Sequence, residues 1–289
     1  MLKWKRIDKD FLSISVSTEY DEKPLYWTSF YYYKGLIVDT GCPNTAEEAA
    51  SFIENMKLGI KAVLLTHSHE DHSGGAHLFK ERFDVEIFAP RNSLEFLLKP
   101  PEIPAYRQMV WGQPEPVAAS PLNRKTEFDG LTVVTFETPG HSFDHVSFLT
   151  DNFMFIGDLV TNPVPIITMR EEDSLRLIDS IKTVVDLDFE AAYGGHGVWD
   201  KSGIRETLNN MVALKQKIQM LSRSGLNVEE IQKEVFANTP KKVLLMEEMS
   251  GGEWSRRNLV ESILGMRHKP PSSSPPKSNV NQIHHRAKD

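Results

Sequence analysis

Four side chains that can bind a metal ion stand close together in this sequence: His67, His69, Asp71 and His72. They follow the run 60–65, which is short, apolar and partly β-branched and therefore predicts a buried strand. Residues two apart on an extended backbone project to the same side, so His67 and His69 can bind one ion together. Asp71 and His72 precede a Ser-Gly-Gly turn that can aim them at a neighbouring point. The spacing predicts two adjacent metal positions.

The alternative is that these side chains only fill a loop. A single loop histidine is more often a surface or hydrogen-bonded residue than a metal ligand. Three histidines and an aspartate at this spacing are polar, mutually crowded and costly to order without an ion. Imidazole and carboxylate groups are also the ordinary ligands of zinc. The cluster therefore favours a metal site.

Further acids and histidines occur where later strands are expected to end. His141 follows the alternating strand 131–136 and a Pro-Gly pair, and Asp158 ends the apolar run 153–158. A charged carboxylate at the end of a buried apolar strand is costly unless a positive group pairs with it. His196 lies between glycines after a short apolar strand, which alone is a weak signal because such turns are common.

Asp39 precedes Thr-Gly at the end of the expected strand 36–38. Two interpretations are open from the local sequence. Asp39 either forms a turn or accepts a hydrogen bond that holds a ligand histidine in one tautomer. Cys42 is expected to be a small residue of the same loop and not a ligand.

These motifs, in their order along the chain, resemble the metallo-β-lactamase superfamily. The residues that carry the resemblance are Asp39, the pattern His67-x-His69-x-Asp71-His72, His141, Asp158 and His196. The resemblance implies an α+β fold, the αββα sandwich, in which two mixed sheets face each other with helices outside and the metals at one edge. It also favours the tautomer-holding interpretation of Asp39.

The resemblance implies a role for each metal ligand. His67, His69 and His141 would hold the first ion, Asp71, His72 and His196 would hold the second, and Asp158 would bridge them. We also assign Asp71 a catalytic role.

The remaining histidines near these motifs receive minor roles. The family's histidine follows Pro-Gly as His141 does, so His145 is expected to be a supporting or structural residue. His77 is expected to be packed or solvated.

The residue at position 158 indicates the branch of the family. A cysteine there would indicate a true β-lactamase, whereas the aspartate of this sequence resembles glyoxalase II and related hydrolases.

Composition limits the partners and the compartment. The chain has 289 residues, a formal net charge of -7 and one cysteine. This acidic balance disfavours nonspecific binding to nucleic acid or anionic lipid. The single cysteine, the charged N-terminus and the lack of a membrane-length apolar run make a cytoplasmic protein the expectation. The oligomeric state is open, with a homodimer as one option.

The chain divides into three expected parts. Residues 1–200 form the metal-binding domain, and apolar stripes predict a helical C-terminal region at 201–267. Residues 268–289 are rich in proline, serine and polar residues, which predicts a disordered tail. The proline-rich stretch 100–121 is expected to be an irregular connection, either a binding loop or an insertion.

The expected function is a metal-dependent hydrolase. Two zinc ions, with iron or manganese fitting the same ligands, would share a hydroxide and polarise the oxygen of a small acyl substrate such as a thioester or lactone. An iron-dependent persulfide dioxygenase and a phosphodiesterase or nuclease of the same fold are the alternatives.

Overall fold

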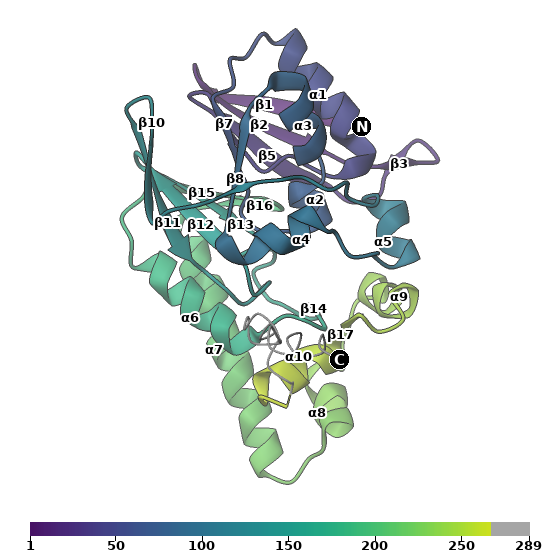
Figure 1. Ribbon diagram of the computed structural model, residues 1–289. Coiled ribbons are helices and arrows are strands. Elements are labelled where there is room, and N and C mark those ends of the chain that lie inside the picture. Colours follow the sequence, from purple (N-terminus) through teal and green to yellow (C-terminus); the bar gives the residue numbers. More distant parts are fainter. Residues whose placement is uncertain (267–289) are drawn as a thin grey trace, which may run out of the picture.

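Side chains that alternate along β5 (Thr28–Tyr33) pack into two different cores. Phe30 and Tyr32 face a core that also contains helical side chains, whereas Tyr31 and Tyr33 face a core between two sheets. Successive residues of a strand point to opposite faces, so a strand buried on both faces lies between two layers. The computed structural model describes residues 1–266, and its layers are visible in Figure 1.

The first sheet is mixed. Its first four strands are antiparallel, and its last four, which begin with β6, run parallel. In spatial order it contains β1 (Leu2–Asp8), β2 (Phe11–Val16), β5, β6 (Leu36–Val38), β7 (Ala62–Leu64), β8 (Glu86–Ala89) and β9 (Ser120–Pro121). Parallel neighbours end at the same edge, so the residues after β6 and β7 meet there.

The second sheet is also mixed, with a single parallel pair between β13 and β15. In spatial order it contains β10 (Lys125–Phe128), β11 (Leu131–Glu137), β12 (Val146–Thr150), β13 (Phe153–Gly157), β15 (Ala191–Gly194) and β16 (Gly197–Trp199). A separate two-stranded hairpin is formed by β3 (Glu19–Tyr20) and β4 (Lys23–Pro24).

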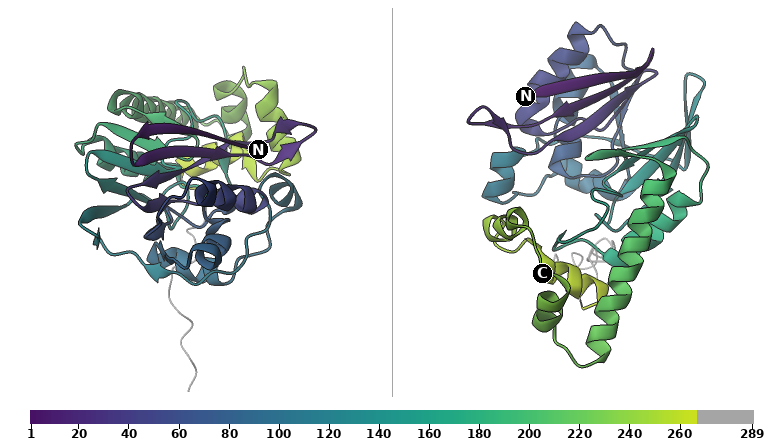
Figure 2. Two further views of the ribbon diagram at one scale, coloured as in Figure 1. Left: turned by 90° about the horizontal axis from the view of Figure 1, so that it is seen from above. Right: turned by 180° about the vertical axis from the view of Figure 1, so that it is seen from behind.

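Helices cover the outer face of each sheet. The first sheet packs against α1 (Ala46–Asn55) and α3 (Ala76–Phe83), and the second against α6 (Ser174–Val185) and the N-terminal part of α7 (Lys201–Arg223). Figures 1 and 2 show these two helical layers on opposite sides of the paired sheets. The predicted αββα sandwich with a C-terminal helical extension is confirmed.

Shorter elements lie in the connections between strands of the first sheet, at the edge where the site lies. They are η1 (Pro43–Thr45), α2 (Glu70–Ser73), η2 (Arg91–Ser93), α4 (Leu94–Leu98) and α5 (Ala105–Val110). No helix in the described part of the chain is both long and apolar enough to cross a bilayer.

The C-terminal region lies below this edge in Figure 1 and has its own small core. It consists of the end of α7, α8 (Val228–Val235), α9 (Lys241–Met249), β17 (Trp254–Ser255) and α10 (Arg256–Ile263). The strand β17 pairs with β14 (Thr168–Met169) of the N-terminal part. The helix α8 begins at a reciprocal capping box that Asn227 and Glu230 form.

Several elements differ from the sequence prediction. The strands β1, β10 and β16 were not predicted, because they are exposed and lack a long apolar run. The stretch 100–121 is not wholly irregular, since it contains α5 and β9. The expected tail at 268–289 lies outside the described residues.

Candidate metal centre

All seven predicted ligands lie at one edge of the sandwich, each in a connection that follows a strand. His67 and His69 follow β7, Asp71 and His72 lie on α2, His141 lies between β11 and β12, Asp158 follows β13, and His196 lies in the turn between β15 and β16. The ligand atoms form a first group from His67, His69 and His141, and a second group from Asp71, His72, Asp158 and His196. Within each group the atoms lie within 4.8 Å of one another.

The first group contains only imidazoles. The Nδ1 atom of His69 lies 2.9 Å from Nε2 of His141, and Nε2 of His67 is buried without a hydrogen-bond partner. Burial lowers the pKa of His67 well below its usual value, and the neighbouring histidines lower it further. The His67 ring is therefore neutral at pH 7 and its lone pair is available to an ion.

Asp158 faces both groups. Its carboxylate lies 3.1 Å from Nε2 of His72, 3.1 Å from Nε2 of His196 and 3.5 Å from Nε2 of His141. This is the place that a bridging carboxylate would occupy. Burial would raise the pKa of Asp158, but His196 and His72 outweigh it and hold that pKa well below the usual value.

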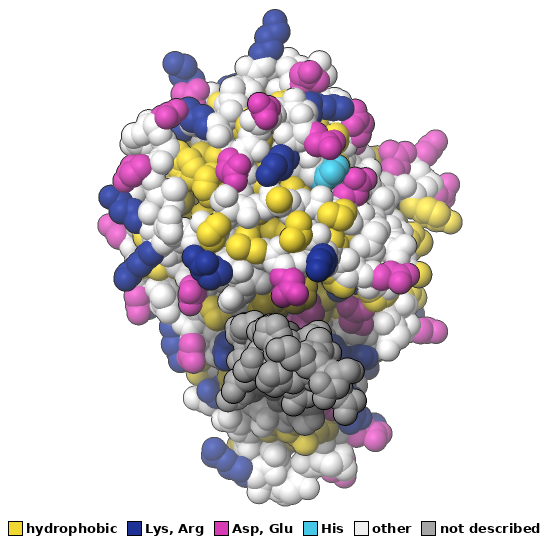
Figure 3. Space-filling model, in the orientation of Figure 1, with side chains coloured by type: hydrophobic (Ala, Val, Ile, Leu, Met, Phe, Trp, Pro, Cys, Tyr) yellow, Lys and Arg dark blue, Asp and Glu magenta, His cyan; other side chains and the backbone are white. Residues whose placement is uncertain are grey.

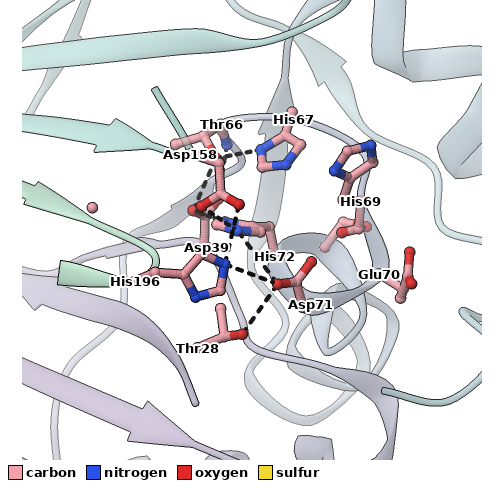
Figure 4. A network of polar contacts seen from close by, with 12 residues as sticks. Thr28, Asp39, Thr66, His67, His69, Glu70, Asp71, His72, Asp158 and His196 are labelled. Carbon is pink, nitrogen blue, oxygen red and sulfur yellow. Dashed lines mark hydrogen bonds and ion pairs between the residues drawn. The ribbon is translucent and has the colours of Figure 1, made fainter. Parts of the chain in front are cut away.

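Asp71 completes the second group. Its Oδ2 atom accepts a hydrogen bond from the Thr28 hydroxyl at 3.1 Å and lies 3.5 Å from Nε2 of His196. In Figure 4 the side chains of Asp71, Asp158 and His196 point toward one another. Burial lowers the pKa of His72 and His196, but the Asp158 charge and the other acids outweigh it and raise both pKa values well above the usual value. Protons on these rings balance the carboxylates, and bound cations would replace them.

Asp39 acts as the acceptor that the family resemblance favoured. Its Oδ2 atom lies 2.8 Å from Nδ1 of His72, and its Oδ1 atom accepts a hydrogen bond from the Thr66 backbone at 2.8 Å. A proton on Nδ1 of His72 leaves Nε2 directed at the second group. Asp39 also has a φ of 61°, a left-handed backbone conformation that aspartate adopts more readily than most residues.

His145 supports the site without joining either group. Its Nε2 atom accepts a hydrogen bond from the Asp158 backbone at 3.0 Å, and its Nδ1 atom lies 3.1 Å from the carbonyl oxygen of Thr138. Burial, with a further contribution from His141, lowers the pKa of His145 to about 3. The neutral ring can thus accept from Asp158 and donate to Thr138, as a supporting residue should.

The other minor residues behave as expected. Cys42 is buried and contacts the hydroxyl of Thr45 at 3.2 Å. His77 lies on α3 beside Glu81 and Glu115 and belongs to neither ligand group.

Sequence reasoning did not identify two acids, Glu171 and Glu70, that form polar contacts at or beside the predicted ligands. Glu171 lies 2.8 Å from Nε2 of His69, whose other ring nitrogen faces His141. Glu70 is buried and forms a double salt bridge with Arg107, at 2.6 Å for each bond. Glu70 lies beside the cluster in Figure 4 and is not part of it. Their partners are far away in sequence, so no local pattern could have indicated these contacts.

A cavity of about 130 Å³ opens beside His69. Its walls include Phe96, Ile103, Phe143 and Glu171, and much of it is formed by the proline-rich stretch 100–121. The stretch therefore lies next to the candidate metal centre.

The donors fit metal ions better than they fit each other. The Nε2 atoms of His67 and His72 and the Oδ1 atom of Asp158 are buried, yet none has a hydrogen-bond partner. His72 and Asp158 face each other at 3.1 Å without the geometry of a hydrogen bond. Buried polar atoms are nearly always paired, so these atoms are suited to act as metal ligands. Nitrogen and carboxylate donors suit zinc, and iron or manganese can use the same set.

Comparison with known proteins agrees with this geometry. The family model described as "Metallo-beta-lactamase superfamily" matches residues 31–196. The chain is 35% identical over 121 residues to a hydroxyacylglutathione hydrolase of Thiobacillus denitrificans, a match that covers 42% of this chain and 40% of that protein. It is 32% identical over 167 residues to an atrochrysone carboxyl ACP thioesterase of Aspergillus fumigatus, covering 56% of this chain and 47% of that one. The chain thus spans less than half the length of either relative.

Among solved structures, the chain resembles a metallo-beta-lactamase family protein from Thermus thermophilus. The TM-score is 0.64 at 18% identity, and the match covers 89% of this chain and 92% of the other. At this identity the likeness supports the fold alone.

Proposed function

Because the chain belongs to the metallo-β-lactamase superfamily, we propose that it is a metal-dependent hydrolase of small acyl compounds that carries two zinc ions. The observation that carries this proposal is the pair of ligand groups that share an edge and meet at Asp158. Iron or manganese could take the place of zinc with the same donors.

The chain's own residues have distinct tasks in this proposal. Bound divalent ions would polarise the acyl oxygen of the substrate and make water a stronger nucleophile. Asp158 would supply negative charge to cations in both ligand groups. Asp71 is kept ionised because His72 and His196 outweigh the effect of burial and hold its pKa well below the usual value. We assign Asp71 the orientation of the attacking water.

A thioester or lactone is the substrate class that we propose. Two relatives are named as a hydroxyacylglutathione hydrolase and an ACP thioesterase, which supports a thioester. The cavity beside His69 has apolar walls from Phe96, Ile103 and Phe143, and we assign it to the apolar part of the acyl group.

We do not propose a nucleic-acid or membrane partner. The net charge is -7, and in Figure 3 acidic and basic side chains are interspersed among the described residues of the face shown. An anionic polymer would need a concentrated basic surface. A cytoplasmic location and a homodimer as one possible assembly belong to the same proposal.

Metal analysis together with a substrate panel tests the proposal. Protein purified without chelators should contain two ions per chain and hydrolyse thioesters or lactones, with loss of activity after chelation and recovery with zinc. One ion or none would contradict the dinuclear site. Bound iron with thiol-dependent oxygen uptake and no hydrolysis would replace the proposal with a persulfide dioxygenase.

A further inference from the structure

His69 is held from outside the metal centre by Glu171. Its Nδ1 atom faces His141 at 2.9 Å, so this nitrogen is the one available to an ion. Its Nε2 atom faces Oε1 of Glu171 at 2.8 Å and must then carry the proton. Glu171 thus fixes both the tautomer and the orientation of His69, as Asp39 does for His72 in the second group.

The side chain of Glu171 is half exposed, so its position depends on the backbone that carries it. This backbone is the segment between β14 and α6. The C-terminal region forms hydrogen bonds to both ends of this segment. At its start, β14 pairs with β17, and the Asn258 amide donates to the carbonyl of Thr168 at 3.3 Å. At its end, the Ser262 hydroxyl donates to the carbonyl of Glu172 at 2.9 Å and accepts from the Ser174 backbone at 2.7 Å.

The C-terminal region is also linked to the segment that carries Asp71 through a second set of hydrogen bonds. Glu253, just before β17, accepts hydrogen bonds from Arg107 at 2.9 Å and from the Tyr106 hydroxyl at 3.0 Å. Arg107 in turn holds Glu70, the residue before Asp71. Segments from three distant parts of the chain thus meet beside the first group.

We propose that Glu171 is a positioning residue for His69 and that the C-terminal region, through Ser262, sets how tightly the first group binds its ion. Neither Glu171 nor Ser262 belongs to a ligand group. The inference rests on the proposed function only in requiring that the first group binds a divalent ion.

Zinc affinity of the first group can be measured in a His196→Ala background, which breaks the second group. Competition with a chromophoric chelator gives the affinity, and circular dichroism checks the fold. In this background, Glu171→Ala should weaken binding about 10- to 100-fold, the range seen for partners of metal-bound histidines. Glu171→Gln keeps an acceptor oxygen and should recover most of the loss.

In the same background, Ser262→Ala should also weaken zinc binding, by several-fold, although Ser262 does not contact His69. The matched control is Asp179→Ala, which removes an exposed acid of α6 that pairs with nearby Lys182, and it should change nothing. A second background, His67→Ala, breaks the first group. In this background, Glu171→Ala should leave the zinc affinity of the second group unchanged.

Three results would overturn the inference. They are an affinity within about twofold of the background for Glu171→Ala, an equal loss in both backgrounds, and an unchanged affinity in Ser262→Ala. Because the assay contains no substrate, these results would leave the hydrolase proposal standing. A wild-type chain that binds no zinc would overturn both.

Discussion

Asp158 combines two properties that a merely structural acid would not need. It is buried, and it faces histidines of both ligand groups at 3.1 to 3.5 Å. Asp158→Asn keeps the size and one oxygen but removes the charge that two cations would share. We expect this variant to fold, as judged by circular dichroism, and to lose second-group zinc affinity by more than about 100-fold together with most turnover.

Asp151→Asn is the matched control, because Asp151 lies on the turn before the same strand. Its carboxylate pairs with Lys34 at 2.7 Å and accepts from Tyr33, away from both ligand groups. An exposed ion pair contributes about 0 to 1 kcal/mol, so metal content and turnover should hardly change. Equal losses in both variants, or full metal content in Asp158→Asn, would show that Asp158 is structural.

His145 should make the stability of the metal-free protein depend on pH. Its pKa is about 3 in the folded chain, against about 6.5 for an ordinary histidine. Between these values only the unfolded chain takes up the proton, so this group destabilises the fold as pH falls below about 6.5. The contribution reaches about 2 kcal/mol between pH 7 and pH 5.

His145→Asn removes this dependence. We expect the variant to be less stable than the wild type at pH 7, because two buried hydrogen bonds are lost. The difference in the free energy of unfolding should then narrow by about 2 kcal/mol on going to pH 5. Urea unfolding of chelated protein at both pH values measures it, and a constant or widening difference would refute the assignment.

Site residues could be predicted when their partners lie close to them in the sequence. His67, His69, Asp71 and His72 lie within six positions, so their spacing could be recognised from the sequence alone. Arg107 and Glu171 act on the metal motif across long sequence separations, and each looks like an ordinary surface charge when read alone. Their roles depend on how three segments pack.

At the scale of elements, the loop that carries His141 is shaped by its contact with α6. Gly140 has a φ of +143°, and an added Cβ atom would lie 2.4 Å from the backbone of Leu177. The backbone of Asp173, at the start of α6, also donates to the Gly140 carbonyl at 2.7 Å. A side chain at Gly140 would therefore push the helix and the ligand loop apart.

Gly140→Ala should lower the free energy of unfolding by at least about 3 kcal/mol, from overpacking and backbone strain together. It should also weaken zinc binding to the first group, since His141 moves with the loop. Gly130→Ala is the control, because Gly130 has a φ of +85° but no atom within 4 Å of an added Cβ. It should cost about 1 kcal/mol from strain alone. Similar losses of stability and zinc affinity in both variants would rule out the packing argument.

Elements with a buried face were predictable, whereas exposed ones were not. The short apolar run that forms β7 and the helical apolar stripe of α7 are both visible in the sequence. The strand β1 has a mostly exposed pattern and becomes a strand because it pairs with β2. The pairing of β14 with β17 joins two-residue strands from distant segments, which no local pattern indicates.

At the scale of the whole molecule, the hydrophobic cores and the candidate metal centre occupy different places in the fold. The three large cores lie between the layers, and the candidate ligands lie at one edge. The order of the motifs along the chain carried the family resemblance, and that resemblance predicted the sandwich. The same order could not show that the C-terminal region returns to this edge, because that contact rests on Glu253, Ser262 and their distant partners.

This separation of core and site predicts how the protein responds to metal removal. Chelated protein should keep its circular dichroism spectrum but unfold at a lower temperature, because buried carboxylates and imidazoles then lack cations. Zinc that binds only the folded chain stabilises it by about 2.7 kcal/mol per site at a free concentration of 100 times the dissociation constant. Two sites should therefore raise the melting temperature by several degrees.

The size of this zinc effect should depend on pH in a defined direction. The acids around His72 and His196 raise the pKa of both rings well above the usual value, so protons occupy the nitrogens that zinc needs. Lowering the pH strengthens this competition, and zinc binding must release those protons. We expect the melting temperature of the protein to rise more on adding zinc at pH 8 than at pH 6. Equal shifts at both pH values, or no shift at either, would show that these two histidines do not bind the ion.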